Sequence, residues 1–93
     1  MHVANIKPKK SWDTLENLVT EAINETGTLT EGKTYEIYNN GGATAQVLAQ
    51  EKEPTAKDIG RLIPTGHAFR YTMGVNVCHI KAPSACDLHI EEV

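Results

Sequence analysis

The spacing of the hydrophobic residues changes once along the chain. Between residues 12 and 25, apolar side chains that include Trp12, Leu15 and Val19 recur three and four positions apart, as on one face of a helix. Beyond Thr34 the apolar residues alternate with polar ones, which is the period of a strand with one buried face. The pattern predicts one amphipathic helix followed by β-structure.

The predicted helix has recognisable ends. Ser11 is expected to cap its start, Asp13 in the first turn favours the helix dipole, and Gly27 is expected to stop it. Its apolar face contains the only tryptophan of the chain. That face must dock on the rest of the domain or on a partner.

The β-rich part is expected to form hairpins between consecutive strands. A three-residue loop, Asn40 to Gly42, pairs Ile37 with Ala45 and Tyr35 with Val47 and keeps one face apolar. A polar loop at 50–58, a short strand at 61–63 and a turn at 64–66 follow. Strands 67–72, 75–81 and 87–92 are then expected to pair in order through turns at 73–74 and 83–85. Their shared apolar face comprises Phe69, Tyr71, Cys78, Ile80, Leu88 and Ile90, and His79 lies on the opposite, mostly polar face.

Short antiparallel strands at this spacing predict a mainly β fold. We expect a small antiparallel β-sandwich or barrel with an N-terminal arm and one amphipathic helix. The expected divisions are a basic arm at 1–10, an amphipathic helix at 11–27 and a β-sandwich domain at 28–93. A chain of 93 residues makes one domain with a small core.

Charge is unevenly distributed along the chain. The first ten residues carry Lys7, Lys9 and Lys10 and no acidic residue, although the net charge of the whole chain is −3. Such a tail is typical of an arm that grips a partner, or of a terminus that is simply solvated. The acidic balance argues against nucleic acid as a partner. No apolar run is long enough to span a membrane, and the basic start leads into no apolar segment of a secretory signal.

One stretch matches a phosphate-binding motif. Residues Gly27 to Thr34, GTLTEGKT, fit the P-loop pattern G-x-x-x-x-G-K-[ST]. A P-loop needs a strand before it and a helix opening at the Lys-Thr, because the helix N-terminus holds the phosphates. Here a helical pattern precedes the motif and a strand pattern follows it. We therefore expect a turn that feeds a strand, and no nucleotide cofactor.

Cysteine and histidine are concentrated near the C-terminus. Cys78, His79, Cys86 and His89 are all zinc-ligand types, but a structural zinc needs four convergent ligands and neighbouring strand residues point to opposite faces. No metal site is predicted, although whether His79 and His89, expected opposite each other, bind a surface metal stays open. The cysteines are expected to be reduced, buried and too far apart along their strands to bridge.

His67 and Cys78 are expected on one face and resemble a nucleophile and its base. No orienting third group or oxyanion-stabilising feature accompanies them. We expect no catalytic residue and no enzymatic activity.

A set of turns and strands carries a likeness to a known family. The stretch 32–42, GKTYEIYNNGG, is followed by Glu53-Pro54, by 60–66, GRLIPTG, and by closing strands with Tyr71, Val77 and Ile80. Over residues 28–93 this order resembles small β-sandwich proteins of bacteriophage virions, such as head decorations and tail or fibre components. Thr65, inserted between Pro64 and Gly66, and the long N-terminal segment depart from the family pattern.

The resemblance implies a non-enzymatic structural protein of the virion, assembled in the host cytoplasm. It implies a homo-oligomer, with a trimer as the expected form, that docks on another virion protein through its N-terminal segment. The alternatives are a carbohydrate- or small-ligand-binding module that uses Tyr38 or Trp12 in a cleft, and a Cys/His metalloprotein. The candidate interface residues are Lys7, Lys9, Lys10, Trp12, Leu15, Val19, Val75 and Val77.

Overall fold

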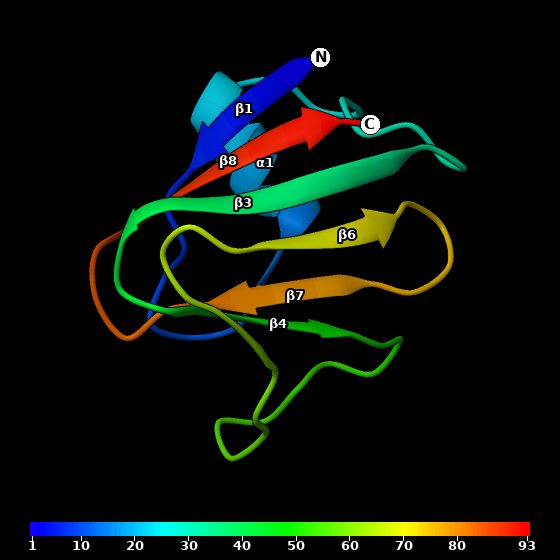
Figure 1. The fold of residues 1–93 in the computed structure, drawn as a ribbon. Helices are drawn as coiled ribbons and strands as arrows, with labels where there is room; N and C mark the ends of the chain where they lie inside the picture. Colours follow the sequence, from blue (N-terminus) through cyan, green and yellow to red (C-terminus); the bar gives the residue numbers. More distant parts are fainter.

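The computed structural model describes residues 1–93 as two four-stranded antiparallel sheets packed face to face (Figure 1). The first sheet has the order β1 (His2–Ile6), β8 (Cys86–Glu92), β3 (Thr34–Gly42) and β6 (Ala68–Thr72). The second has the order β2 (Asp13–Thr14), β7 (Cys78–Lys81), β4 (Ala45–Ala49) and β5 (Arg61–Ile63). The predicted small antiparallel β-sandwich is confirmed.

The chain crosses between the sheets at almost every connection. Only β4 and β5 are consecutive strands that lie side by side; every other strand is followed by a strand of the opposite sheet. Eight strands connected in this order form a jelly roll, an architecture of two interlocked Greek keys.

The predicted hairpins are wrong, although the predicted inward faces are correct. Ile37 pairs with Phe69 on β6 and Ile90 on β8, and Ala45 pairs with Ile63 on β5. Alternation specifies which side chains point into the core, but two facing sheets share that core. The same alternation therefore fits two consecutive strands that pair as a hairpin and two that face each other across the core. The residues expected to point inward are nearly all buried, namely Tyr35, Ile37, Ala45, Val47, Tyr71, Cys78, Ile80, Leu88 and Ile90, with Phe69 half-buried.

Asn39, fully buried near the end of β3, lies where the chain crosses from β3 in the first sheet to β4 in the second. Its side-chain Nδ2 donates to the carbonyl of Ala43 at 2.9 Å and to that of Ile63 in the opposite sheet at 2.8 Å. Its Oδ1 accepts from the amide of Gly41 at 3.0 Å. A buried amide is tolerated where its hydrogen-bonding groups find partners, so this residue links the sheets at a point where an apolar side chain would not.

The N-terminal residues do not form a separate arm. His2–Ile6 is an edge strand of the first sheet, and its alternation buries Ala4 and Ile6. The lysines that suggested an arm follow this strand. They drew attention away from the short alternation of buried Ala4 and Ile6 with exposed Asn5.

Helix α1 spans Leu15–Ile23, which is shorter than predicted at both ends. Thr14, not Ser11, is the N-cap, and its Oγ1 accepts from the amide of Asn17 at 3.2 Å. Asn24 ends the helix in the left-handed conformation, three residues before Gly27. Asp13 belongs to β2, because the chain pairs with β7 before it turns into the helix.

The apolar face of α1 docks on its own sandwich. Leu15, Leu18 and Val19 belong to the buried core, and the helix packs against β1, β2 and β7. Since β2 has only two residues, α1 takes the place of the missing strand and covers that side of the sandwich.

We expect Asn39→Ala to lower the free energy of unfolding by about 3 kcal/mol, because the buried carbonyl of Ile63 and the part-buried carbonyl of Ala43 and amide of Gly41 lose their partner. Urea unfolding followed by circular dichroism measures this. Asn40→Ala, at the exposed neighbouring position, is the matched control and should change stability by less than about 0.5 kcal/mol. Equal effects of the two substitutions would contradict the role of Asn39.

Candidate interaction surface

The predicted cysteine and histidine cluster is dispersed by the fold. Cys78 lies in the second sheet and Cys86 in the first, and both are free and buried, as expected. His79 and His89 are also in different sheets, so the predicted pairing of these histidines is wrong. His79 is buried rather than solvated, with Nε2 at 3.0 Å from the carbonyl of Gln50. No group of three or more His, Cys, Asp or Glu side chains is arranged to hold a metal ion.

His89 instead lies beside His2, with ring centroids 4.3 Å apart. Both rings approach Oδ1 of Asn5, at 3.2 Å from His2 and 3.1 Å from His89. Sequence reasoning missed this contact because it placed residues 1–10 outside the sheet. The signal was available in the alternation of Ala4 and Ile6.

The structure contains no activated Cys78–His67 pair. Burial raises the pKa of the Cys78 thiol to about 12, so this group is protonated at neutral pH. His67 is exposed in the turn before β6. The expected turn at the P-loop match is confirmed, since Lys33-Thr34 leads into β3 and not into a helix.

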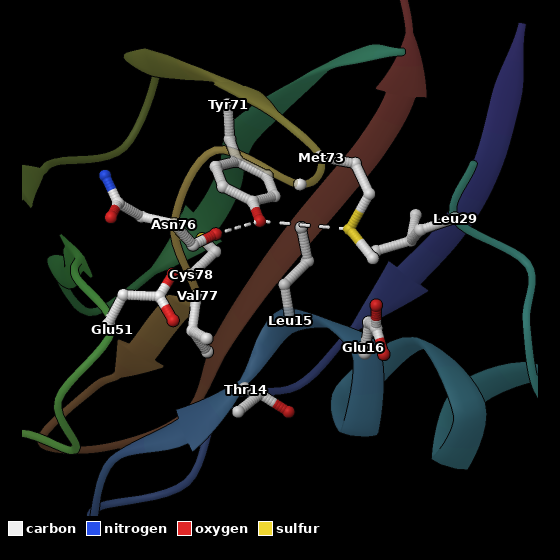
Figure 2. Close-up of a pocket in the computed structure, with 11 residues that line it drawn as sticks. Thr14, Leu15, Glu16, Leu29, Glu51, Tyr71, Met73, Asn76, Val77 and Cys78 are labelled. Carbon is white, nitrogen blue, oxygen red and sulfur yellow. Dashed lines mark hydrogen bonds between the residues drawn. The ribbon is translucent and has the colours of Figure 1, made fainter. Parts of the chain in front are cut away.

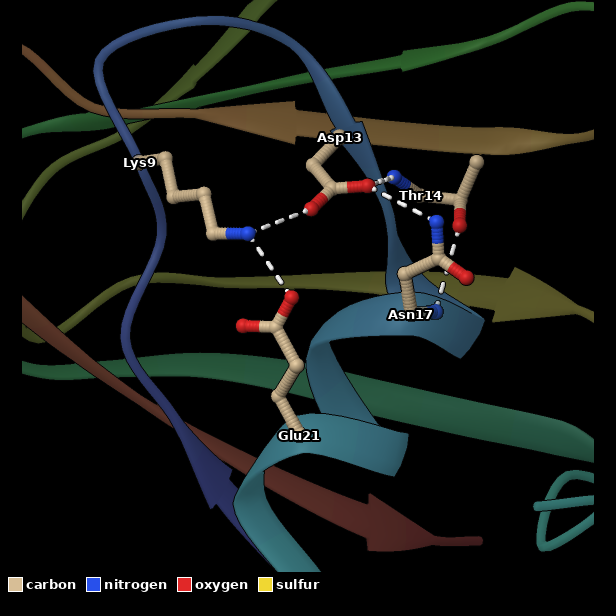
Figure 3. Close-up of polar contacts among 5 residues, drawn as sticks. All are labelled: Lys9, Asp13, Thr14, Asn17 and Glu21. Carbon is tan, nitrogen blue, oxygen red and sulfur yellow. Dashed lines mark hydrogen bonds and ion pairs between the residues drawn. The ribbon is translucent and has the colours of Figure 1, made fainter. Parts of the chain in front are cut away.

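Lys9 makes its contacts within its own chain. Its Nζ lies 3.2 Å from Asp13 Oδ2 and 2.7 Å from Glu21 Oε1, which joins the segment after β1 to α1 (Figure 3). The hydrogen bonds that Lys9 donates, most of all to Glu21 and next to Asp13, raise the pKa of Lys9. Lys7 and Lys10 remain exposed and form no ion pair.

The other N-terminal interface candidates are also occupied. Leu15 and Val19 are core residues, so they do not pack between subunits. Trp12 lies on the outer side of the second sheet, where Nε1 donates to the carbonyl of Thr55 at 3.0 Å and Lys81 Nζ lies 4.6 Å from the ring centroid. Tyr38 is half-buried in β3 of the first sheet, so the two aromatics belong to different parts of the sandwich.

The two long sides of the sandwich differ. Helix α1 covers the side formed by β1 and β2, whereas β5 and β6 are the last strands of their sheets on the opposite side. There, the Arg61 guanidinium carbon lies 5.6 Å from the centre of the Phe69 ring and bridges the two strands. Ile59, Leu62 and Val75 are exposed, by 81%, 59% and 66%. We call this part of the molecule the open side; it comprises the two edge strands with Arg61, Leu62 and Phe69, together with Ile59 just before β5 and Val75 just after β6.

Strand β6 presents unpaired backbone groups along the open side. The carbonyl of His67 accepts from the amide of Asn39, and the amide of Met73 donates to the carbonyl of Lys33. The backbone groups of His67, Met73 and every second residue between them therefore point toward β3. In an antiparallel ladder the intervening residues point their backbone groups the other way, which here is outward. A free strand edge of this kind is a template for pairing with another chain.

A half-open pocket of about 210 Å³ lies between the start of α1 and the loop that joins β6 to β7 (Figure 2). We call it the end pocket. Val77, a candidate interface residue, lines it and is half-buried, whereas Val75 lies on the open side. Its apolar lining consists of Leu15, Leu29, Tyr71, Met73, Val77 and Cys78.

The polar groups of the end pocket are partly paired. The Tyr71 hydroxyl donates to the carbonyl of Asn76 and lies 3.8 Å from the sulfur of Met73. Burial raises the pKa of Tyr71, and the negative charges of Glu16 and Glu51 add to the effect. These two carboxylates are exposed at the rim, and neither forms an ion pair. The pocket therefore combines an apolar wall with unpaired negative charge.

No protein-family model matches the chain, and comparisons with curated proteins and with solved structures found no match. The one helix has nine residues, so no helix has the length and hydropathy of a membrane span.

We expect stability to fall between pH 9 and 12, because the unfolded thiol of Cys78 ionises near 9 while the folded one ionises at about 12. In this window the unfolded state releases a proton that the folded state keeps, which favours unfolding. Urea unfolding at about pH 8 and about pH 10.5 measures the loss. Cys78→Ala lacks the titrating group and should lose less stability; an equal loss would contradict the assignment.

Proposed function

We propose that this protein is a non-enzymatic structural subunit that self-associates, and that it serves as a component of a phage virion. The observation that carries the proposal is the difference between the two sides of the sandwich. One side is closed by α1, and the other presents exposed apolar residues beside the free edge of β6.

Exposed apolar side chains beside an unpaired edge favour association. Ile59 and Val75 each leave most of their surface in water, and burying apolar surface contributes about 25 cal/mol per Å². A chain of 93 residues has a small core, so burial between subunits adds a large share of apolar contact. The charged Arg70, exposed on β6, protects the edge from unspecific pairing.

The virion assignment draws on two further observations. The strand order is that of a jelly roll, an architecture found in viral capsid domains as well as in lectins and cupins. Residues 28–93 also resemble small virion β-sandwich proteins in their turns. Because one fold serves many functions, these observations support the assignment by analogy.

The proposed docking surface differs from the one that the sequence suggested. The N-terminal segment is part of the sandwich, so the open side replaces it as the surface for self-association. Residues 1–25 form β1, β2 and α1, whose apolar side chains are part of the core. Lys7 and Lys10 stay free for an acidic surface of another virion protein.

We expect the wild-type chain to form a homo-oligomer, with a trimer as the expected form, and Val75→Glu to shift it toward monomer. The introduced charge would be desolvated in the interface. Light scattering over a range of concentrations measures the mass, and Ala22→Glu, at an exposed position of α1, is the matched control. A wild-type monomer at every concentration would contradict the proposed self-association. Mass spectrometry of particles purified from cultures that encode the chain tests the virion assignment.

A further inference from the structure

We propose that the end pocket receives Ile59 of a second copy, with Lys57 and Arg61 of that copy against Glu16 and Glu51, so that chains join head to tail. This inference rests on the proposed self-association and specifies which two surfaces meet. The open side of one chain, through Ile59, meets the end pocket of the next.

The size of the end pocket suits side chains better than a whole ligand. Its volume of about 210 Å³ is below the roughly 300–1,000 Å³ that is typical of small-molecule sites. Its wall is formed by aliphatic, aromatic and sulfur-containing side chains, which favour an apolar occupant. An isoleucine or a similar side chain is therefore the kind of group that this pocket takes.

The charge at the rim restricts the occupant further. Glu16 follows the N-cap of α1 on one side of the pocket, and Glu51 follows β4 on the other (Figure 2). Neither carboxylate has a cation beside it. Complementary charge across an interface gives specificity, so the occupant is expected to carry basic groups next to its apolar side chain.

The chain itself contains a segment with this combination. Ile59 is 81% exposed, and Lys57 and Arg61 lie two residues before and after it. Both basic side chains are exposed, and neither forms an ion pair. The guanidinium of Arg61 lies over the Phe69 ring. Because the arginine side chain is long and flexible, it can extend from there to a carboxylate of the neighbouring chain.

The segment that presents Ile59 is held in place before it docks. The loop between β4 and β5 projects from the sandwich (Figure 1). Within it, Thr55 and Asp58 hydrogen-bond to each other through the Thr55 amide, at 2.8 Å, and through the Asp58 amide, at 3.1 Å. The Trp12 indole fixes the same turn to the body of the chain. A segment held in this way loses less entropy on binding.

The two surfaces are different parts of the chain, and in the proposed head-to-tail arrangement the contact is heterologous. Repeating a heterologous contact gives a closed ring when the rotation closes and an open filament when it does not. A ring of three is consistent with the expected trimer. An isologous dimer would instead exchange the contact reciprocally, with Ile59 of each chain in the end pocket of the other, and its mass would stay at twice that of the monomer.

Two variants that each remove one surface test the proposal. The pocket variant carries Glu16→Lys and Glu51→Lys, and the loop variant carries Ile59→Asp and Lys57→Glu. All four positions are exposed, so both variants should fold, which circular dichroism checks. A control with Glu25→Lys and Glu91→Lys makes the same change in charge at exposed carboxylates away from both the pocket and the docking loop.

We expect each variant alone to be a monomer and the control to keep the wild-type mass. Mixed in equal amounts, the pocket variant and the loop variant should give a 1:1 heterodimer, because one intact contact remains and cannot repeat. Sedimentation velocity measures these masses. Raised salt should weaken the heterodimer, because the charge pairs lie at the rim.

Other results would overturn the proposal in distinguishable ways. A wild-type monomer would contradict both this inference and the proposed self-association. An oligomer that survives in the pocket variant would place the contact elsewhere and leave self-association standing. Two monomeric variants that do not combine on mixing would exclude a head-to-tail contact.

Discussion

The arrangement of the strands depends on the crossing from β3 to β4, and the side chain of Asn39 stabilises this crossing. This fully buried amide donates to the carbonyl of Ala43, in the crossing from β3 to β4, and to that of Ile63 in the opposite sheet, and it accepts from the amide of Gly41. Gly42 completes the crossing, because its φ of +96° and the carbonyl of Ala85, 2.4 Å from where a Cβ would stand, leave no room for a side chain. With β4 directed into the opposite sheet, β6 and β8 become the neighbours of β3. This crossing is one of those that together produce the jelly-roll order.

The sequence predicted the orientation of most side chains and few of the pairings. The alternation of Tyr35 and Ile37 identified buried positions correctly, and so did that of Leu88 and Ile90. Which strands pair depends on where the chain passes from one sheet to the other. The segment Asn39 to Gly42 is as compatible with a hairpin loop as with such a crossing. The signal for a crossing is the buried polar residue at position 39, whose burial is visible only in three dimensions.

The candidate surfaces were hidden from the sequence for a related reason. The end pocket draws Leu15, Leu29 and Val77 from separate parts of the chain, which the crossings bring together. The open side exists because α1 supplements the two-residue β2 on one side only. Ile59 and Val75 have no pattern that marks them as neighbours of a sheet edge. Length, charge and periodicity predicted the class of fold, and the topology determines the surfaces.

The most direct test of this account is hydrogen exchange of the Asn39 side-chain amide, followed by nuclear magnetic resonance. If its protons join Ala43 and Ile63 across the sheets, they should exchange only when the whole domain unfolds, far more slowly than those of the exposed Asn40. Contacts between Ile37 and Ile90 should appear in the same spectra, and none of the hairpin type between Ile37 and Ala45. Rapid exchange at Asn39, equal to that at Asn40, would contradict the crossing and the arrangement of both surfaces with it.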